Sequence, residues 1–104
     1  MMDRVERIKE MLTTNPHDSF LNHALALEYI KAGNDAAAQT IFEQLLEREP
    51  GYVGSYYHLA KLFERNGNEQ QAIAWYEKGM HIAKEKADQH AFNELRSAWE
   101  ELTF

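Results

Sequence analysis

Histidines and carboxylates are the side chains whose types and spacing could support chemistry in this chain. His81 and Glu85 stand four residues apart, as do His90 and Glu94, so each pair would lie one turn apart on a helix and could share a metal ion. Spacing of this kind arises often by chance in helical sequences. We therefore expect both pairs to face solvent.

No motif for holding a nucleotide or a reactive group is present. The sequence lacks a Gly-rich phosphate loop, a dinucleotide fingerprint and a His-Glu-x-x-His pair. Cysteine is absent, which excludes disulfides, thiolate metal sites and cysteine nucleophiles. Ser19 and Ser55 have no base near them in sequence, and they stand at expected helix starts, where capping explains them. We predict that the chain is not an enzyme and needs no cofactor.

The length and net charge of the chain limit its number of domains and the partners that we expect. The 104 residues fit one domain, 1–104, and 11 Lys and Arg against 17 Asp and Glu give a net charge of −6. No basic run exists that could follow a phosphate backbone, so we expect no nucleic-acid partner. No stretch is apolar enough to span a membrane or to serve as a signal peptide, which favours a cytoplasmic location.

The sequence repeats itself with a period of 34 residues. Sliding the chain by this distance aligns residues of the same or similar type at fixed positions. The aligned residues are Pro16 with Pro50, Leu25 with Leu59, Ala26 with Ala60, Tyr29 with Phe63, Gly33 with Gly67, Asn34 with Asn68, Ala38 with Ala72, Phe42 with Tyr76, and Glu43 with Glu77.

Physical reasons exist for the residue types at the centre of each repeat. Gly33 and Gly67 are expected to end the first helix of a pair in the left-handed conformation that glycine tolerates. Asn34 and Asn68 would then cap the second helix, and Gln71 could complete a capping box with Asn68. Ala38 and Ala72 are small and would let the two helices approach closely. Phe42 and Tyr76 would fill the space between neighbouring pairs.

This pattern resembles the tetratricopeptide repeat, in which each unit of this length folds into two helices. The resemblance implies an all-α fold, a helical-hairpin solenoid with two full repeats and a capping helix at each end, in a small stand-alone protein of the bacterial type. The expected parts are an N-terminal half-repeat helix over 1–15, repeats over 19–52 and 53–86, and a C-terminal capping helix over 88–102.

Some positions depart from the family pattern. The large aromatic residue near the start of a repeat is Tyr56 in the second copy but Asn22 in the first. A residue that is usually a small alanine late in the repeat is Leu45 in the first copy and Gly79 in the second. We interpret both as tolerable variations in packing.

In the N-terminal helix, an apolar stripe is expected at Val5, Ile8, Met11 and Leu12.

The C-terminal register is less regular, since no proline follows the second repeat. Keeping the 34-residue step would place polar side chains in the core, namely Asn93, Glu94 and Ser97. Moving the register by two residues places apolar side chains there instead, namely Phe92, Leu95 and Trp99. We prefer this register, with Asp88 as the cap of a separate helix. The alternative is one unbroken helix over 69–102.

The resemblance also implies a function, because proteins of this kind bind a partner's peptide in the concave groove lined by the first helices of the pairs. A partner peptide or protein is therefore expected in a groove whose residues are Phe20, His23, Leu27, Lys31, Gly54, Tyr57, His58, Lys61, Arg65 and His90. Some relatives grip acidic chaperone tails with a clamp of Lys, Asn and Arg. No lysine or arginine of that clamp is kept here, so chaperone tails are not expected as ligands.

Two alternatives to a peptide-binding module remain at this point. The chain could be a self-associating structural module, a homodimer, if the apolar residues near its end are exposed: Trp99, Leu102 and Phe104. The aligned clamp positions would alternatively bring histidines together, and these could bind a metal ion or, when protonated, an acidic group. That set is His23, His58 and His90 with Glu94.

Overall fold

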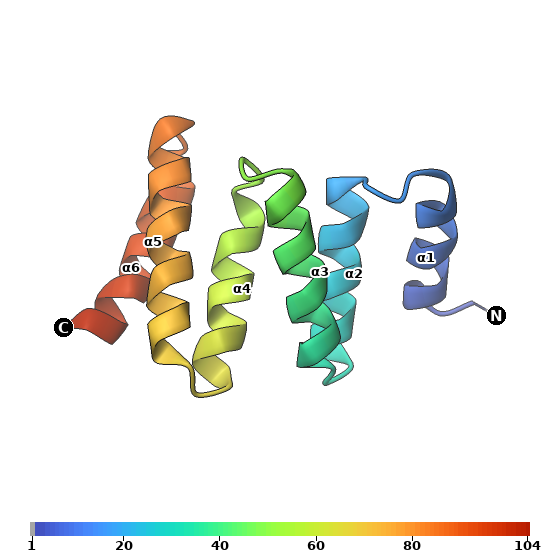
Figure 1. Ribbon diagram of the computed structural model, residues 1–104, viewed down its shortest axis with the longest axis horizontal. Helices are drawn as coiled ribbons and strands as arrows, with labels where there is room; N and C mark the ends of the chain where they lie inside the picture. Colours follow the sequence, from blue (N-terminus) through green and yellow to red (C-terminus); the bar gives the residue numbers. More distant parts are fainter. Residues whose placement is uncertain (1) are drawn as a thin grey trace. The chain divides into compact units, whose positions relative to one another are not determined.

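A computed structural model describes residues 2–104 as six helices without a strand, gathered into two compact units. The first unit ends at Glu49, and the second runs from Pro50 to Phe104. The helices are α1 (Arg4–Thr14), α2 (Ser19–Lys31) and α3 (Asp35–Arg48) in the first unit, and α4 (Gly54–Arg65), α5 (Glu69–Glu85) and α6 (Gln89–Thr103) in the second (Figure 1).

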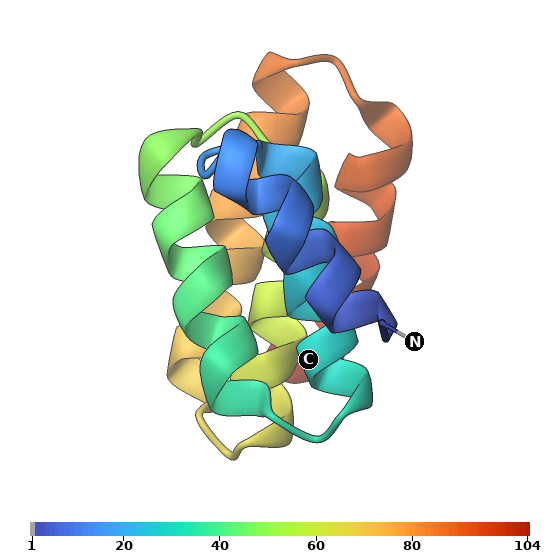
Figure 2. The same cartoon turned by 90° about the vertical axis from the view of Figure 1, so that its right-hand side faces the viewer.

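Each unit contains one closely packed helix pair and one further helix. The pairs are α2 with α3 and α4 with α5, as the repeat predicts. In the first unit α1 packs against α2 (Figure 1), and it crosses in front of α2 in Figure 2. In the second unit α6 packs against α5 and also contacts α4. The all-α helical-repeat solenoid is therefore confirmed.

The turns inside the two pairs have the predicted geometry. Gly33 and Gly67 have φ angles of +78° and +84°, in the left-handed region. The side chains of Asn34 and Asn68 accept hydrogen bonds from the backbone N–H groups three residues later. The predicted capping box forms only in part. The Asn68 N–H donates to the carbonyl of Phe63 at 2.8 Å, so it does not need the side chain of Gln71 as an acceptor.

A turn of the same kind separates α5 from α6. Ala87 has a φ of +55°, the Asp88 N–H donates to the Ala83 carbonyl at 2.8 Å, and the Asp88 side chain accepts from the Ala91 N–H at 3.0 Å. These bonds end one helix and cap the next, as Gly67 and Asn68 do at the end of α4. The predicted break with Asp88 as cap is confirmed, and the unbroken helix is wrong.

At the starts of α2 and α4, two serines do not have the capping role that the sequence predicted. Asp18 caps α2 by accepting a hydrogen bond from the Leu21 N–H, whereas Ser19 donates its hydroxyl to Glu49 at 2.7 Å. Helix α4 begins after Val53 without a side-chain cap, and Ser55 is fully buried. Capping therefore explains neither serine.

The turns that lead into α2 and α4 are held by equivalent bonds from different side chains. In the first repeat the Asn22 amide donates to the carbonyl of Pro16 at 3.1 Å. In the second repeat the Tyr56 hydroxyl donates to the carbonyl of Pro50. Asn22 and Tyr56 occupy the same repeat position, so this departure from the family pattern keeps one function, which is to tie the proline turn to the helix that follows it.

The core of each unit lies between its helices and follows the predicted stripes with two exceptions. Met11 is 49% exposed, so it does not belong to the buried stripe of α1, where Ile8 alone is fully buried. In α6, Leu95 is buried as predicted, but Phe92 and Trp99 are only half-buried. The polar residues that the strict register would have buried, Asn93, Glu94 and Ser97, are exposed.

Candidate interaction surface

One side of α4 carries the residues that the sequence assigned to a binding surface in the second unit. Residues spaced by three and four along this helix stay at least partly accessible, while the opposite side forms core. We call this set the α4 stripe. Its members are Gly54, Tyr57, His58, Lys61, Glu64 and Arg65.

The centre of the α4 stripe is held by a connected set of polar and aromatic contacts. The Lys61 Nζ lies 5.6 Å from the centroid of the Tyr57 ring and 3.5 Å from Glu64 Oε2. The same carboxylate oxygen accepts a hydrogen bond of 2.8 Å from the Tyr76 hydroxyl, which comes from α5. The Tyr57 and Tyr76 rings are 6.3 Å apart. Each member of this set restricts the rotamer of the next.

Tyr76 anchors this arrangement from the core. Its ring is fully buried, and burial together with the bond to Glu64 raises its pKa, so the hydroxyl stays protonated and acts as a donor. The sequence prediction treated Tyr76 only as a space-filling residue. The sequence does contain a hint of this bond. In the first repeat the positions equivalent to Tyr76 and Glu64 hold Phe42 and Ile30, so the hydroxyl and the carboxylate are both present in the second repeat and both absent from the first.

His58 lies where α4 meets α6. It is half-buried, and its ring stands edge-on to that of Tyr57 with a centroid separation of 5.6 Å. Burial lowers the pKa of His58, and the carboxylate of Glu94 on α6 partly offsets this effect. The imidazole is therefore neutral at pH 7, where it can donate one hydrogen bond and accept another.

The other residues assigned to the second unit are more open. Gly54 is the exposed first residue of α4, and Arg65 is its exposed last residue. His90 is exposed on the first turn of α6, one turn before Glu94. Together with the α4 stripe, these two α6 residues form a surface that we call the α4/α6 face.

The residues assigned to the first unit all lie on α2 but differ in environment. Phe20 is 70% exposed. Leu27 is half-buried. His23 is also half-buried, and its ring packs edge-on against Phe42 of α3 with a centroid separation of 5.6 Å. Of these three, Phe20 therefore presents the most apolar surface to solvent.

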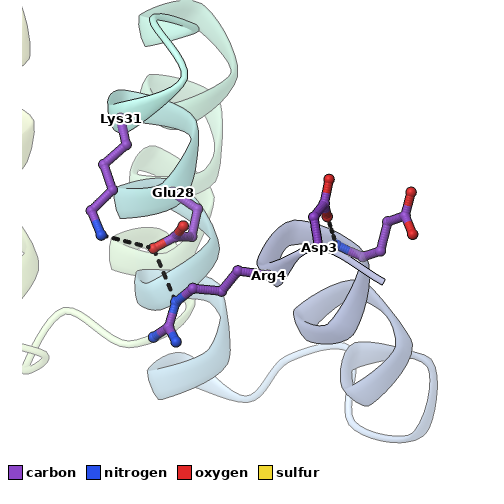
Figure 3. A network of polar contacts seen from close by, with 5 residues as sticks. Asp3, Arg4, Glu28 and Lys31 are labelled. Carbon is purple, nitrogen blue, oxygen red and sulfur yellow. Dashed lines mark hydrogen bonds and ion pairs between the residues drawn. The ribbon is translucent and has the colours of Figure 1, made fainter. Parts of the chain in front are cut away.

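Lys31, the last residue assigned to the first unit, takes part in an ion-pair network (Figure 3). Its Nζ lies 3.4 Å from Glu28 Oε2, and the Arg4 Nε of α1 lies 3.1 Å from the same oxygen. The Glu28 side chain is only 15% exposed, while both cations are largely exposed. Lys31 therefore balances a carboxylate within its own unit.

The described residues, 2–104, contain neither a candidate metal site nor a candidate membrane span. Within residues 2–104 no group of three or more His, Cys, Asp or Glu side chains could hold a metal ion. His81 and Glu85 form an exposed pair 3.5 Å apart, as expected of solvent-facing residues. No helix in the described part of the chain is both long and apolar enough to cross a bilayer.

Comparison with known families agrees with the repeat and the helix pairs. The family model described as tetratricopeptide repeat matches residues 23–84, which include most of α2 and all of α3 and α4. The chain belongs to the tetratricopeptide repeat family. None of the curated proteins compared with the chain is significantly similar to it.

Solved structures support the same assignment. A tetratricopeptide repeat domain protein from Salinibacter ruber, solved in solution, is 41% identical, with a TM-score of 0.81 over 85% of this chain and 89% of that one. A crystal structure of such a protein from the same organism is also 41% identical, with a TM-score of 0.79 over 83% and 96% of the two chains. A solution structure from Bordetella parapertussis is 24% identical, with a TM-score of 0.85 over 99% and 90%, and shows the fold alone.

Family membership defines the general class of activity. Tetratricopeptide repeats are protein-interaction modules, and proteins built from them are generally non-enzymatic scaffolds that bind other proteins. On the α4/α6 face, Lys61 and Glu64 form an ion pair.

Proposed function

We propose that this protein binds a segment of a partner protein on the α4/α6 face of its second unit. Tyr57 would be the main apolar anchor, because it is the large aromatic ring of the α4 stripe. His58 and Lys61 would provide polar contacts on either side of it. The partner segment would lie across α4 and α6, where His58 and Glu94 face one another.

The observation that carries this proposal is the fixed position of the Tyr57 and Lys61 side chains. Lys61 is held between the Tyr57 ring and Glu64, and Glu64 is held by the buried Tyr76 hydroxyl. Ordering a free side chain on binding costs about 0.5–1.5 kcal/mol, so a side chain ordered in advance leaves more of the contact energy for affinity. Aromatic residues fixed in this way are frequent binding hot spots.

The polar groups on this face suit a peptide better than a strongly charged ligand. Lys61 and Glu64 carry opposite charges 3.5 Å apart and largely cancel at a distance. His58 has a lowered pKa, so it is neutral at pH 7 and adds no charge to this face. The face therefore offers an aromatic anchor beside balanced polar groups.

A comparison of two matched double variants tests the proposal. Tyr57→Ala with Lys61→Gln removes the aromatic and cationic pair of the α4 stripe. Trp75→Ala with Lys78→Gln removes a similar pair from α5, where the Lys78 Nζ lies 4.7 Å from the Trp75 ring centroid. Partners captured from cells by the wild type should be lost from the first variant and retained by the second.

Binding constants for a captured partner would give the size of the effect. Loss of an anchor worth about 2 kcal/mol or more corresponds to a decrease in affinity of at least about 30-fold. Melting curves of both variants are needed, since Tyr57 packs near Tyr76 and its removal also costs stability. Equal binding by the two variants would contradict the proposal. Sedimentation of the wild type alone would reveal self-association if that is the function instead.

A further inference from the structure

Helix α1 is attached to the first unit by few buried atoms. Of its 11 residues, only Ile8 is fully buried, at 3% exposure, and Val5 and Leu12 on the adjacent turns are half-buried. The remaining side chains of α1 are exposed. By contrast, α2 and α3 each bury at least three side chains and pack closely against each other.

The polar contacts between α1 and α2 lie at the surface. Arg4 pairs with Glu28, but the Arg4 side chain is 70% exposed (Figure 3). The Lys9 Nζ lies 5.7 Å from the centroid of the Tyr29 ring. Exposed ion pairs and cation–π contacts contribute little to stability, and the ion pair is weakened further by salt. The apolar contact at Ile8 therefore dominates the attachment.

The C-terminal end of α1 is also weakly stabilised. Its last turn carries no basic residue, and the Asn15 N–H donates to the Met11 carbonyl at a long distance of 3.4 Å. The corresponding bonds that end α2 and α3 are 3.0 and 2.8 Å long. A helix of 11 residues is marginal in water once it leaves its packing partner.

We propose that α1 is a removable cover, and that the surface of α2 beneath it binds an amphipathic helix from a partner protein. The chemistry of that helix follows from the segment that now occupies the site. It needs apolar residues at the spacing of Val5, Ile8 and Leu12, and a basic residue directly before the first of them. This basic residue would replace Arg4 beside the Glu28 carboxylate, which complements it in charge. The site is in the first unit and is independent of the α4/α6 face.

Amide hydrogen exchange of the full chain tests whether α1 opens on its own. The amides of α1 should exchange at least about 10-fold faster than those of α2 and α3, since local opening needs less free energy than unfolding of the unit. Glu28→Gln should increase exchange in α1 and leave α3 unchanged. Glu47→Gln, an exposed carboxylate of α3, is the matched control. Equal protection of all three helices would overturn the proposal.

A synthetic peptide of residues 2–15 is the probe for the vacated site. The full chain with Ile8→Ala, whose own α1 is loosened, should bind this peptide with amide shifts around Glu28 and Tyr29. The wild-type chain should bind it much more weakly, because its own α1 competes at an effective concentration on the order of millimolar. A peptide carrying Ile8→Ala should bind at least about 10-fold more weakly than the unchanged peptide, and a peptide carrying Arg4→Glu about 3-fold more weakly.

Three further outcomes would each contradict the proposal that α1 covers a binding site. No shifts with the Ile8→Ala chain at millimolar peptide would overturn the binding site. If Ile8→Ala removes protection from α2 and α3 as well, α1 is an integral part of the core and the proposal is wrong. A wild-type dimer that the Ile8→Ala variant cannot form would also overturn it, because α1 would then exchange into a second copy of the chain.

Discussion

Gly79 is the position where a single added methyl group should have the clearest effect on the fold. It is buried in the middle of α5, and residues of α4 and α6 lie next to it. A Cβ atom at this position would lie 2.7 Å from the Cβ of Tyr56 and 3.0 Å from Cδ1 of Leu95. The Tyr56 Cβ is bonded directly to the backbone, so it cannot move aside without shifting α4. Gly79→Ala must therefore separate two helices.

The size of the effect follows from two opposing contributions. Alanine is favoured over glycine in a helix by about 1 kcal/mol. Overpacking of a core costs about 1–3 kcal/mol, and a contact at 2.7 Å with an atom near the backbone belongs in the upper part of that range. The net loss in free energy of unfolding should be about 1–2 kcal/mol. In a domain of this size, each 1 kcal/mol corresponds to roughly 4–8 °C in Tm.

Tryptophan fluorescence in urea is a suitable assay, because Trp75 and Trp99 are the two tryptophans of the chain and both lie in the second unit. Ala74→Gly, at an exposed position of the same helix, measures the helix-propensity contribution and should itself cost about 1 kcal/mol. The sum of the two losses in free energy of unfolding then gives the cost of the crowding alone. A Gly79→Ala protein that is more stable than wild type would refute the close approach of α4 and α5.

Three further predictions concern the second unit. Ala87→Gly should raise the free energy of unfolding by up to about 1 kcal/mol, because Ala87 has a φ of +55°, and a denaturation curve checks this. Tyr76→Phe should cost about 1 kcal/mol in the same assay through loss of the bond to Glu64. The lowered pKa of His58 means that protonation favours the unfolded chain, so stability falls as the pH drops below about 6.5. Melting temperatures at about pH 7.5 and about pH 5.5 should differ less in His58→Gln than in wild type or the exposed-site control His81→Gln.

The helix pairs and their turns could be predicted from the sequence because they depend on local chemistry. Gly33, Gly67 and the asparagines that follow them specify a left-handed residue and a cap, whatever lies around them. Asp88 could be recognised as a cap for the same reason. The left-handed conformation of Ala87 could not, because alanine has no preference for it and the surrounding structure must impose it.

Contacts between helices were harder to predict because they depend on pairs of residues that are far apart in the chain. The sequence alone gives no reason to connect Leu45 of the first repeat and Gly79 of the second with the residues at 22 and 56. The Gly79 contact shows why the two repeats differ. Tyr56 takes the space that a larger residue at 79 would need, whereas Asn22 stands at the equivalent position in the first repeat. A repeat can keep its total volume while its individual positions change.

For the candidate site, periodicity correctly identified the accessible side of α4 but not the interactions on it. The residues at 54, 57, 58, 61, 64 and 65 are spaced as one helical face, which is visible in the sequence. The bonds that link Lys61, Glu64 and Tyr76 depend on how α5 is shifted and rotated relative to α4, and periodicity does not give this placement. Which partner fits this face depends on residues outside the chain.

The most direct test of the proposed function is to map a captured partner onto the isotope-labelled full chain by amide NMR. We predict that the amide resonances around Tyr57, His58 and Lys61 on α4, and around His90 and Glu94 on α6, shift or broaden together as the partner segment is added. The amides of the exposed side of α5 around Lys78 should remain unchanged. Shifts confined to α5, with the α4 stripe unaffected, would contradict binding at the α4/α6 face.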